Sequence, residues 1–170
     1  MVQFSMTTFT MEELEQQEEQ LRFATFDHDT AIALGDTLYR TARERNLAVT
    51  IDVRAFGQIL FHLAMAGTTP DNDQWVERKS NVVLRFHCAS YRMGRRLAES
   101  GETIAEHSFV DPMTFSPFGG SFPVRLKSGG VIGAVTVSGL PQEEDHALVV
   151  SVLQDNPGLR EGAFMQKKRF

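Results

Sequence analysis

The stretch Ser121-Phe122-Pro123-Val124-Arg125-Leu126-Lys127-Ser128-Gly129-Gly130-Val131-Ile132-Gly133-Ala134-Val135-Thr136-Val137 decides the fold, because two alternating apolar runs flank a pair of glycines. A Gly-Gly dipeptide between such runs is typical of the two-residue turn of a β-hairpin. With Gly129-Gly130 as the turn, one face contains three cross-strand pairs: Leu126 with Gly133, Val124 with Val135, and Phe122 with Val137. The sequence therefore predicts an antiparallel hairpin here.

A second hairpin is predicted upstream, over residues 47–65. Apolar residues alternate with polar ones at its start, at Leu47, Val49, Ile51 and Val53. The short segment Ala55-Phe56-Gly57 then connects this strand to a second apolar run, and two such hairpins fit one mainly antiparallel sheet.

Four helices are predicted around the hairpins, in the order helix, helix, hairpin, helix, hairpin, helix. The first begins at the capping box Thr10-Met11-Glu12-Glu13 and ends near Arg22; its thin apolar stripe favours a solvated cover helix over a docking helix for another subunit. The second is capped by Asp27 and ends near Asn46, and the third and longest spans residues 73–99. The last begins at Pro141 and ends at Asn156-Pro157-Gly158.

Length and composition predict one core. The chain has 170 residues, of which 42% are hydrophobic and 23% charged. We divide it into an acidic N-terminal helix with its lead-in (residues 1–26), an α/β domain (27–156) and a C-terminal tail (157–170) that contains Lys167-Lys168-Arg169.

Charge and cysteine content exclude several classes of protein. The 17 Lys and Arg residues against 22 Asp and Glu residues give a formal net charge of −5, which disfavours nucleic acid as a partner. Cys88 is the single cysteine, so it forms no intramolecular disulfide. No apolar run is long enough to cross a membrane, and we expect a cytoplasmic protein.

Motifs of the common enzyme classes are missing from the sequence. It contains neither a dinucleotide-binding Gly-x-Gly-x-x-Gly loop nor a P-loop. Gly119-Gly120-Ser121-Phe122-Pro123 departs from the Gly-x-Ser-x-Gly serine-hydrolase motif at its last position, and the five histidines lack zinc-site spacing. No residue set meets the demands of a named reaction, so the sequence identifies no catalytic motif and an enzyme stays a third alternative.

Two features predict an anion site on the longest helix. Arg78, Arg85 and Arg92 recur every seven residues and would form one stripe, which would receive carboxylates or phosphates, or pair with acids of a neighbouring helix or subunit. Asn72 and Trp75 lie at the start of that helix, where free amides attract anions; the alternative is helix capping followed by a core tryptophan.

The glycines and histidines give further candidate site residues. Gly119, Gly120 and Ser121 permit close backbone approach, either to a ligand or to another chain. His146 follows three acids, which predicts a capping or packing histidine with a raised pKa. The candidate metal ligands are His62, His87, His107 and Tyr91; for His62 a buried, hydrogen-bonded imidazole is the alternative.

Three segments carry a family resemblance. Asp52, Gly57 and Ile59–Leu63 occupy the first hairpin, Phe118-Gly119-Gly120-Ser121-Phe122-Pro123-Val124 enters the second, and Gly133-Ala134-Val135-Thr136-Val137-Ser138-Gly139 is followed by Asp145. In these segments the chain resembles the haem-degrading-domain superfamily, which includes GlcG-like and HbpS-like proteins, and within it the shorter bacterial and fungal branch. The resemblance implies a profilin-like α/β (α+β) fold with a five-stranded antiparallel sheet, a homo-oligomer, and binding of haem or another tetrapyrrole.

Two hypotheses for the function follow. In the first, an oligomeric protein binds haem or another small anionic ligand near the Gly119-Gly120 segment and the longest helix, with a histidine or Tyr91 as the iron ligand. In the second, the protein is a non-enzymatic oligomeric adaptor whose acidic helix and arginine stripe serve assembly or partner docking.

Overall fold

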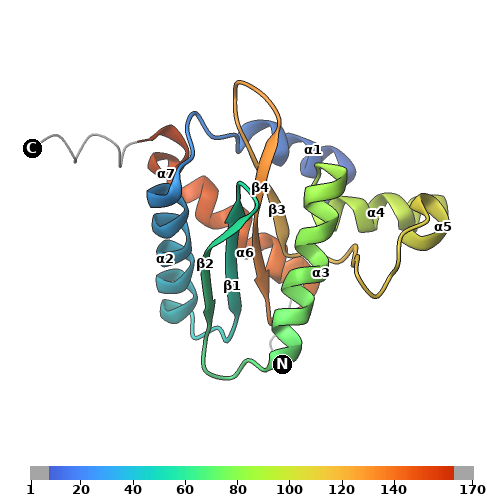
Figure 1. Cartoon of the computed structure of the whole chain (residues 1–170), viewed down its shortest axis with the longest axis horizontal. Helices are drawn as coiled ribbons and strands as arrows, with labels where there is room; N and C mark the ends of the chain where they lie inside the picture. The colour runs from blue at the N-terminus through green and yellow to red at the C-terminus, as the bar shows by residue number, and fades with distance from the viewer. Residues whose placement is uncertain (1–7, 163–170) are drawn as a thin grey trace, which may run out of the picture.

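A single antiparallel sheet lies at the centre of the computed structural model, which describes residues 8–162 (Figure 1). Its strands are β1 (Thr50–Ala55), β2 (Gln58–Ala64), β3 (Ser121–Arg125) and β4 (Val131–Ser138), in the order β2-β1-β4-β3. The α+β class is as predicted, but the fifth strand implied by the family resemblance is not found among the described residues.

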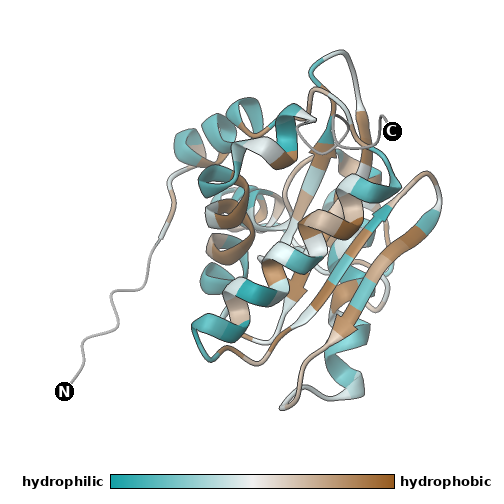
Figure 2. Ribbon diagram, turned by 90° about the vertical axis from the view of Figure 1, so that its left-hand side faces the viewer, coloured by the Kyte–Doolittle hydropathy of each residue, from teal (hydrophilic) through white to brown (hydrophobic). Residues whose placement is uncertain are grey.

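Seven helices accompany the sheet in the described part of the chain. They are α1 (Met11–Gln20), α2 (His28–Glu44), α3 (Pro70–Phe86), α4 (Ser90–Ser100), α5 (Ile104–Ser108), α6 (Gln142–Asp155) and α7 (Pro157–Glu161). Helices α2 and α6 pack on one face of the sheet and α3 crosses the other (Figure 1). The main core lies on the α2 and α6 face, and the strands carry much of the hydrophobic colour in Figure 2.

The first hairpin forms as predicted, with Phe56-Gly57 as its two-residue turn. Both residues have positive φ angles, 56° and 73°, as a type I′ turn requires. On β2, the ring of Phe61 packs against α2 at Gly35, where any Cβ atom would overlap the ring. Gly35 therefore provides the space that lets the edge strand approach α2.

The register predicted for the second hairpin is wrong by two residues. Val124 pairs with Gly133 and Phe122 with Val135, and a bulge follows Val124. The connection is longer than Gly129-Gly130 because Leu126 leaves the ladder and bridges Phe23, in the link between α1 and α2. Pairing with this distant segment outweighs the local preference for a tight Gly-Gly turn.

The predicted helix over residues 73–99 is two helices, α3 and α4. The break is at His87, which adopts the left-handed conformation with a φ of 57°. Helix α4 then begins after Ala89, whose backbone N–H donates to the buried carboxylate of Glu18 in α1. Because α1 supplies this acceptor, its inner face covers the start of α4, where Glu18 also contacts Arg92.

The C-terminal part of the described chain lies against the core. Helix α6 matches the prediction, and its apolar residues Leu148, Val149, Val152 and Leu153 are buried. Leu159 of α7 is also buried, and Ala24 donates a backbone hydrogen bond to Arg160. The run Lys167-Lys168-Arg169 lies outside the described residues. None of the helices within residues 8–162 has the length and apolar character needed to cross a membrane.

Candidate functional site

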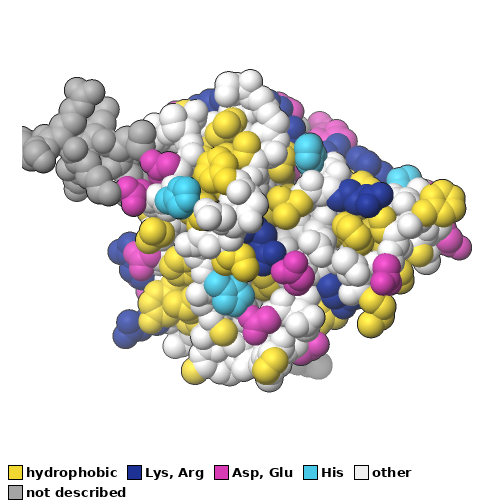
Figure 3. All heavy atoms as spheres, viewed as in Figure 1, with side chains coloured by type: hydrophobic (Ala, Val, Ile, Leu, Met, Phe, Trp, Pro, Cys, Tyr) yellow, Lys and Arg dark blue, Asp and Glu magenta, His cyan; other side chains and the backbone are white. Residues whose placement is uncertain are grey.

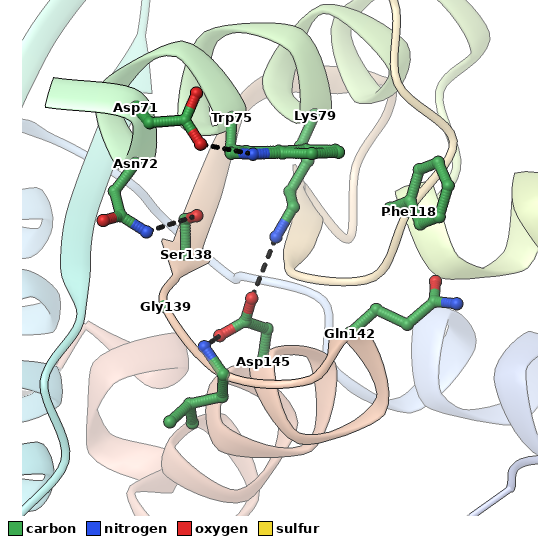
Figure 4. A pocket seen from close by; sticks show the side chains of 10 residues that line it. Asp71, Asn72, Trp75, Lys79, Phe118, Ser138, Gly139, Gln142 and Asp145 are labelled. Atoms are coloured by element: carbon green, nitrogen blue, oxygen red, sulfur yellow. Dashed lines mark hydrogen bonds and ion pairs between the residues drawn. The ribbon is translucent and has the colours of Figure 1, made fainter. Parts of the chain in front are cut away.

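A pocket of about 270 Å³ opens between the first turns of α3, the end of β4 and the start of α6 (Figure 4). Its lining residues are Asp71, Asn72, Trp75, Lys79, Phe118, Ser138, Gly139, Leu140, Gln142 and Asp145. Two of the predicted site residues, Asn72 and Trp75, line this pocket.

The floor of the pocket is an ion pair between Lys79 and Asp145. Lys79 Nζ lies 2.9 Å from Asp145 Oδ2, and the two side chains are 4% and 1% exposed. Burial raises the pKa of Asp145 to about 6, although the Lys79 ammonium and the backbone N–H of Leu140 act in the opposite direction. The site therefore combines a buried cation with an acid that changes charge near pH 6.

The hydrogen bonds of Lys79 leave capacity for a ligand. An ammonium group carries three N–H donors. Within residues 8–162, Lys79 Nζ has two hydrogen-bond acceptors, Asp145 Oδ2 and the Val137 carbonyl oxygen at 3.3 Å. One donor at the floor of the pocket is therefore available to an oxygen atom of a bound molecule.

Aromatic side chains form the wall of the pocket. Trp75 and Phe118 meet edge to face, with ring centroids 5.6 Å apart, and the guanidinium of Arg78 lies 4.7 Å from the Trp75 ring centroid. Trp75 Nε1 donates to Asp71 at 3.1 Å. Trp75 is thus a partly exposed wall residue. Of the alternative, helix capping followed by a core tryptophan, the first half is confirmed, because Asn72 Oδ1 accepts from the Thr69 backbone N–H at 2.9 Å, and the second half is wrong.

Gly119 and Gly120 allow close approach within the chain itself. A Cβ atom at Gly119 would overlap the Gln142 carbonyl oxygen, and one at Gly120 would lie 2.8 Å from Lys79 Nζ. Gly120 also has a φ of 133°, which favours glycine. The adjacent Ser121 is buried in the sheet, where its hydroxyl bonds Thr136 Oγ1 at 2.8 Å. Gly119 and Gly120 therefore pack against two residues of the pocket lining, Gln142 and Lys79.

The predicted arginine stripe does not form, because Arg92 lies on α4 and the helix is broken. Arg92 pairs with Glu15 and Glu18 of α1. Arg78 donates to the Pro112 carbonyl oxygen at 2.9 Å, and Arg85 packs over the rings of Phe86 and Phe115. Of the predicted alternatives for these side chains, the pairing of Arg92 with acids of a neighbouring helix is the one observed.

His146 is buried away from the pocket. Its ring lies 5.1 Å from that of Tyr91, and Nε2 lies 2.7 Å from Gln17 Oε1. Burial lowers the pKa of His146 to about 3, so the predicted rise is wrong. Aromatic rings surround the imidazole, and desolvation therefore decides its charge state.

The four candidate metal ligands lie on separate elements. His62 on β2 is 36% exposed and bonds Asp52 at 2.8 Å and Asp73 at 2.7 Å, so the alternative of a buried imidazole is wrong. His87 caps α3, His107 on α5 bonds Glu102, and Tyr91 on α4 is buried. Residues 8–162 contain no group of three or more His, Cys, Asp and Glu side chains placed to hold a metal ion.

Sequence reasoning assigned no role in the site to Lys79; Phe118 and Asp145 entered as members of family motifs, and Asp145 also as one of the three acids before His146. A signal for Lys79 was present: Asn72, Trp75 and Lys79 follow the spacing of one helix face. Phe118 and Asp145 carry no such signal, since the fold brings them to α3 from distant segments.

The comparisons with known proteins agree with this fold. A family model described as "Haem degrading protein HbpS-like" matches residues 26–154. The chain belongs to this HbpS-like family. It is 51% identical to UPF0303 protein SCO2848 of Streptomyces coelicolor, over 87% of this chain and 94% of the relative. It is 49% identical to a UPF0303 protein of Acidobacterium capsulatum, over 84% and 87%.

Three solved structures share the architecture. The Ybr137w protein superposes with a TM-score of 0.79 at 31% identity, covering 94% of this chain and 90% of that one. HbpS gives a TM-score of 0.61 at 18% identity over 76% and 88%. The structure described as a PduOC:heme complex gives 0.65 at 14% identity over 76% and 94%. The last two establish a common fold only.

Proposed function

We propose that this HbpS-like protein binds a small organic anion in the pocket over Lys79. The observation that carries the proposal is the buried ammonium of Lys79, which has one N–H donor to spare at the pocket floor. A carboxylate oxygen would accept that hydrogen bond, and such charge-assisted bonds are stronger than neutral ones.

The dimensions of the pocket favour a compact ligand with a planar body. Its volume of about 270 Å³ lies just below the range of about 300–1,000 Å³ for sites that hold drug-sized molecules. Trp75 and Phe118 present aromatic surface to the same space (Figure 4). We therefore expect an anion of the size of an aromatic or short-chain carboxylate.

Haem, which the family description implies, does not fit the lining of the Lys79 pocket. Haem iron is held by His, Cys, Met or Tyr side chains, and none of these types lines the Lys79 pocket. Tyr91 borders a separate cavity, but burial and the nearby Glu143 raise the pKa of its phenol, which opposes the phenolate that iron would bind. Both ring nitrogens of His62 are bonded to carboxylates, whereas His107 bonds a carboxylate through Nδ1 alone.

Fluorescence titration tests the proposal directly, because Trp75 is the single tryptophan of the chain and lines the pocket. Benzoate should change the emission saturably, and neutral benzamide should bind about 10- to 100-fold more weakly because it lacks the charge. Asp145→Asn should tighten benzoate binding by removing the opposing carboxylate, whereas Lys79→Met should weaken it.

The matched control is Lys127→Met, which removes an exposed lysine that pairs with Glu161 far from the pocket. It should leave benzoate binding unchanged. Equal binding of benzoate and benzamide, or equal effects of Lys79→Met and Lys127→Met, would refute the anion site. A saturable Soret shift with haemin that Lys79→Met abolishes would overturn the exclusion of haem from this pocket.

We also infer that the chain assembles as a homo-oligomer. The inference is supported by exposed apolar side chains on and beside the β1-β2 hairpin, namely Ile32, Phe56, Ile59 and Leu84, and Figure 3 shows hydrophobic side chains gathered on that part of the face. Glu15 and Glu18 of the acidic helix pair with Arg92 of the same chain, which leaves fewer acids of α1 for the partner docking that the adaptor hypothesis requires. Light scattering that gave a monomer mass would contradict the assembly.

A further inference from the structure

A second cavity, of about 430 Å³, lies on the other side of Phe118 and Gln142, which line both pockets. Helix α4 forms one wall, and the start of α5, the segment Pro117-Phe118 and the start of α6 form the others. Gly94 makes this arrangement possible, because a Cβ atom at that position would overlap the Pro117 carbonyl oxygen. The cavity is thus built into the packing of segments that are distant in sequence.

Two oppositely charged side chains line this cavity, and in the described part of the chain they form no ion pair with each other. Arg95 of α4 and Glu143 of α6 both line it. Within residues 8–162 neither side chain makes an ion pair or a hydrogen bond, and the guanidinium Nε of Arg95 is buried without a partner. Both charges act on the phenol of Tyr91: Glu143 raises its pKa, after the larger effect of burial, and Arg95 lowers it.

The remaining acid at the cavity is already engaged. Glu102 accepts hydrogen bonds from His107 at 3.0 Å and from Ser100 at 3.2 Å. Arg95 and Glu143 are therefore the pair of charges left for a ligand, one for an anionic group and one for a cationic group.

Apolar side chains complete the lining. Leu97 and Ile104 are almost fully buried beneath the cavity, and Ala98, Pro117 and Phe118 border it. A ligand with a hydrocarbon side chain would bury that side chain here, which is favourable in water.

We propose that this cavity binds a free α-amino acid with an apolar side chain. Its carboxylate pairs with Arg95, whose planar guanidinium suits a carboxylate, and its ammonium pairs with Glu143. The side chain lies against Leu97 and Ile104. The volume is ample for such a ligand, and the site is separate from the anion pocket over Lys79.

The test is titration of the full-length protein with L-leucine, read by calorimetry and by amide chemical shifts of Gly94, Ala98 and Ile104. L-leucine should bind saturably and shift these amides. 4-Methylpentanoate, which lacks the ammonium, and 3-methylbutylamine, which lacks the carboxylate, should each bind at least about 10-fold more weakly.

Adjacent residues provide matched controls. Arg95→Met and Glu143→Gln should each weaken L-leucine binding by about 10- to 100-fold, whereas Arg96→Met and Glu144→Gln, which lie outside the cavity lining, should leave it unchanged. Arg95→Lys keeps the charge and should retain part of the affinity.

Three results would overturn the amino-acid site. They are the absence of saturable binding by L-leucine, L-methionine and L-phenylalanine at millimolar concentration, equal binding of L-leucine and 4-methylpentanoate, and equal effects of Arg95→Met and Arg96→Met. Lys79→Met should not affect L-leucine binding, so failure of this site and failure of the anion site are distinguishable.

Discussion

Asp145 is an acid held almost entirely out of water, and its pairing with Lys79 allows both charges to persist inside the fold. Removing one partner of such a pair leaves the other charge without compensation, which costs more than losing a surface ion pair. Burial raises the pKa of Asp145 to about 6, so this carboxylate loses its charge under mildly acidic conditions.

The stability of the protein should therefore depend on Asp145 between about pH 4 and pH 6. Because its pKa in the folded state lies above the ordinary value of 3.8, the folded protein binds this proton more tightly than the unfolded chain. The free energy of unfolding should fall as pH rises through this window, by on the order of 1–3 kcal/mol relative to Asp145→Asn. Urea denaturation at several pH values measures the difference.

Asp155→Asn is the control for this experiment. Asp155 is an exposed residue at the end of α6, and its replacement leaves the Lys79–Asp145 pair intact. The free energy of unfolding of this variant should fall with rising pH as it does in the wild-type protein. Parallel profiles for wild type and Asp145→Asn would show that Asp145 titrates alike in the folded and unfolded states.

For single residues, the sequence predicted where a side chain lies better than it predicted the burial and charge state of that side chain. Asn72 and Trp75 were predicted as site residues because polar groups and an indole began a helix, and both line a pocket; ligand binding there stays a prediction. The charge state of His146 was predicted wrongly, because the acids beside it in sequence do not contact its ring, whereas Phe9, Tyr91 and Phe122 do. Burial of a side chain depends on segments that the local sequence does not contain.

Helix α4 owes its separate existence to a contact over a long sequence distance. The acceptor for the Ala89 amide is Glu18, 71 residues earlier in the chain. Local periodicity in residues 73–99 is continuous across the break, so it predicted one helix. The register of the second hairpin was missed for the same reason, since Phe23 pairs with Leu126 from outside the hairpin.

The crossing of α4 by the Pro117-Phe118 segment should tolerate no side chain at Gly94. We expect Gly94→Ala to lower the free energy of unfolding by about 1–3 kcal/mol, because the backbone carbonyl of Pro117 must move to admit a Cβ atom. Urea denaturation measures the loss. Amide shifts of Ile104 would report the accompanying change in the cavity wall.

Gly129→Ala is the matched control, since a Cβ atom there has no atom other than its chain neighbours within 4 Å among the described residues. Its effect should stay within about 0.5 kcal/mol. A Gly94→Ala variant as stable as Gly129→Ala would mean that the segment shifts freely and does not define the cavity.

For the whole molecule, the class of fold, the two hairpins and the helices α1, α2 and α6 were accessible from periodicity, capping and turn residues, whereas the division into α3 and α4 and the short helices α5 and α7 were not. The family was accessible from short motifs. The strand number implied by the resemblance was not reproduced, because the described chain closes its sheet with the two predicted hairpins alone. Both proposed ligand sites lie where separate elements meet, which explains why no contiguous motif announced them.

His62 links the sheet to helix α3, because its ring bonds Asp52 in the central strand β1 and Asp73 in α3. Burial lowers the pKa of His62, but the hydrogen bonds to these two carboxylates outweigh it and raise the pKa above 6.5. The stability that the charged imidazole contributes is present below pH 6.5 and is lost as pH rises through the raised value.

We therefore expect the free energy of unfolding to fall as pH rises from about 6 to about 8. His62→Gln should remove the share of this fall that comes from deprotonation of the imidazole. Asp73→Asn should reduce the fall in the free energy of unfolding, because Asp73 bonds His62. Asp71→Asn, which alters the acceptor of Trp75 Nε1 instead, should leave the fall unchanged. Urea denaturation at both pH values and an imidazole titration by NMR give the comparison. Equal slopes in wild type and His62→Gln would contradict a role for His62.

The approach of Phe61 to Gly35 links two positions that are 26 residues apart in the chain. A larger residue at position 35 is compatible with this packing only if the ring at position 61 is lost or moves. We therefore expect substitutions at these two positions to depend on each other: a side chain at position 35 should be tolerated only together with a residue smaller than phenylalanine at position 61.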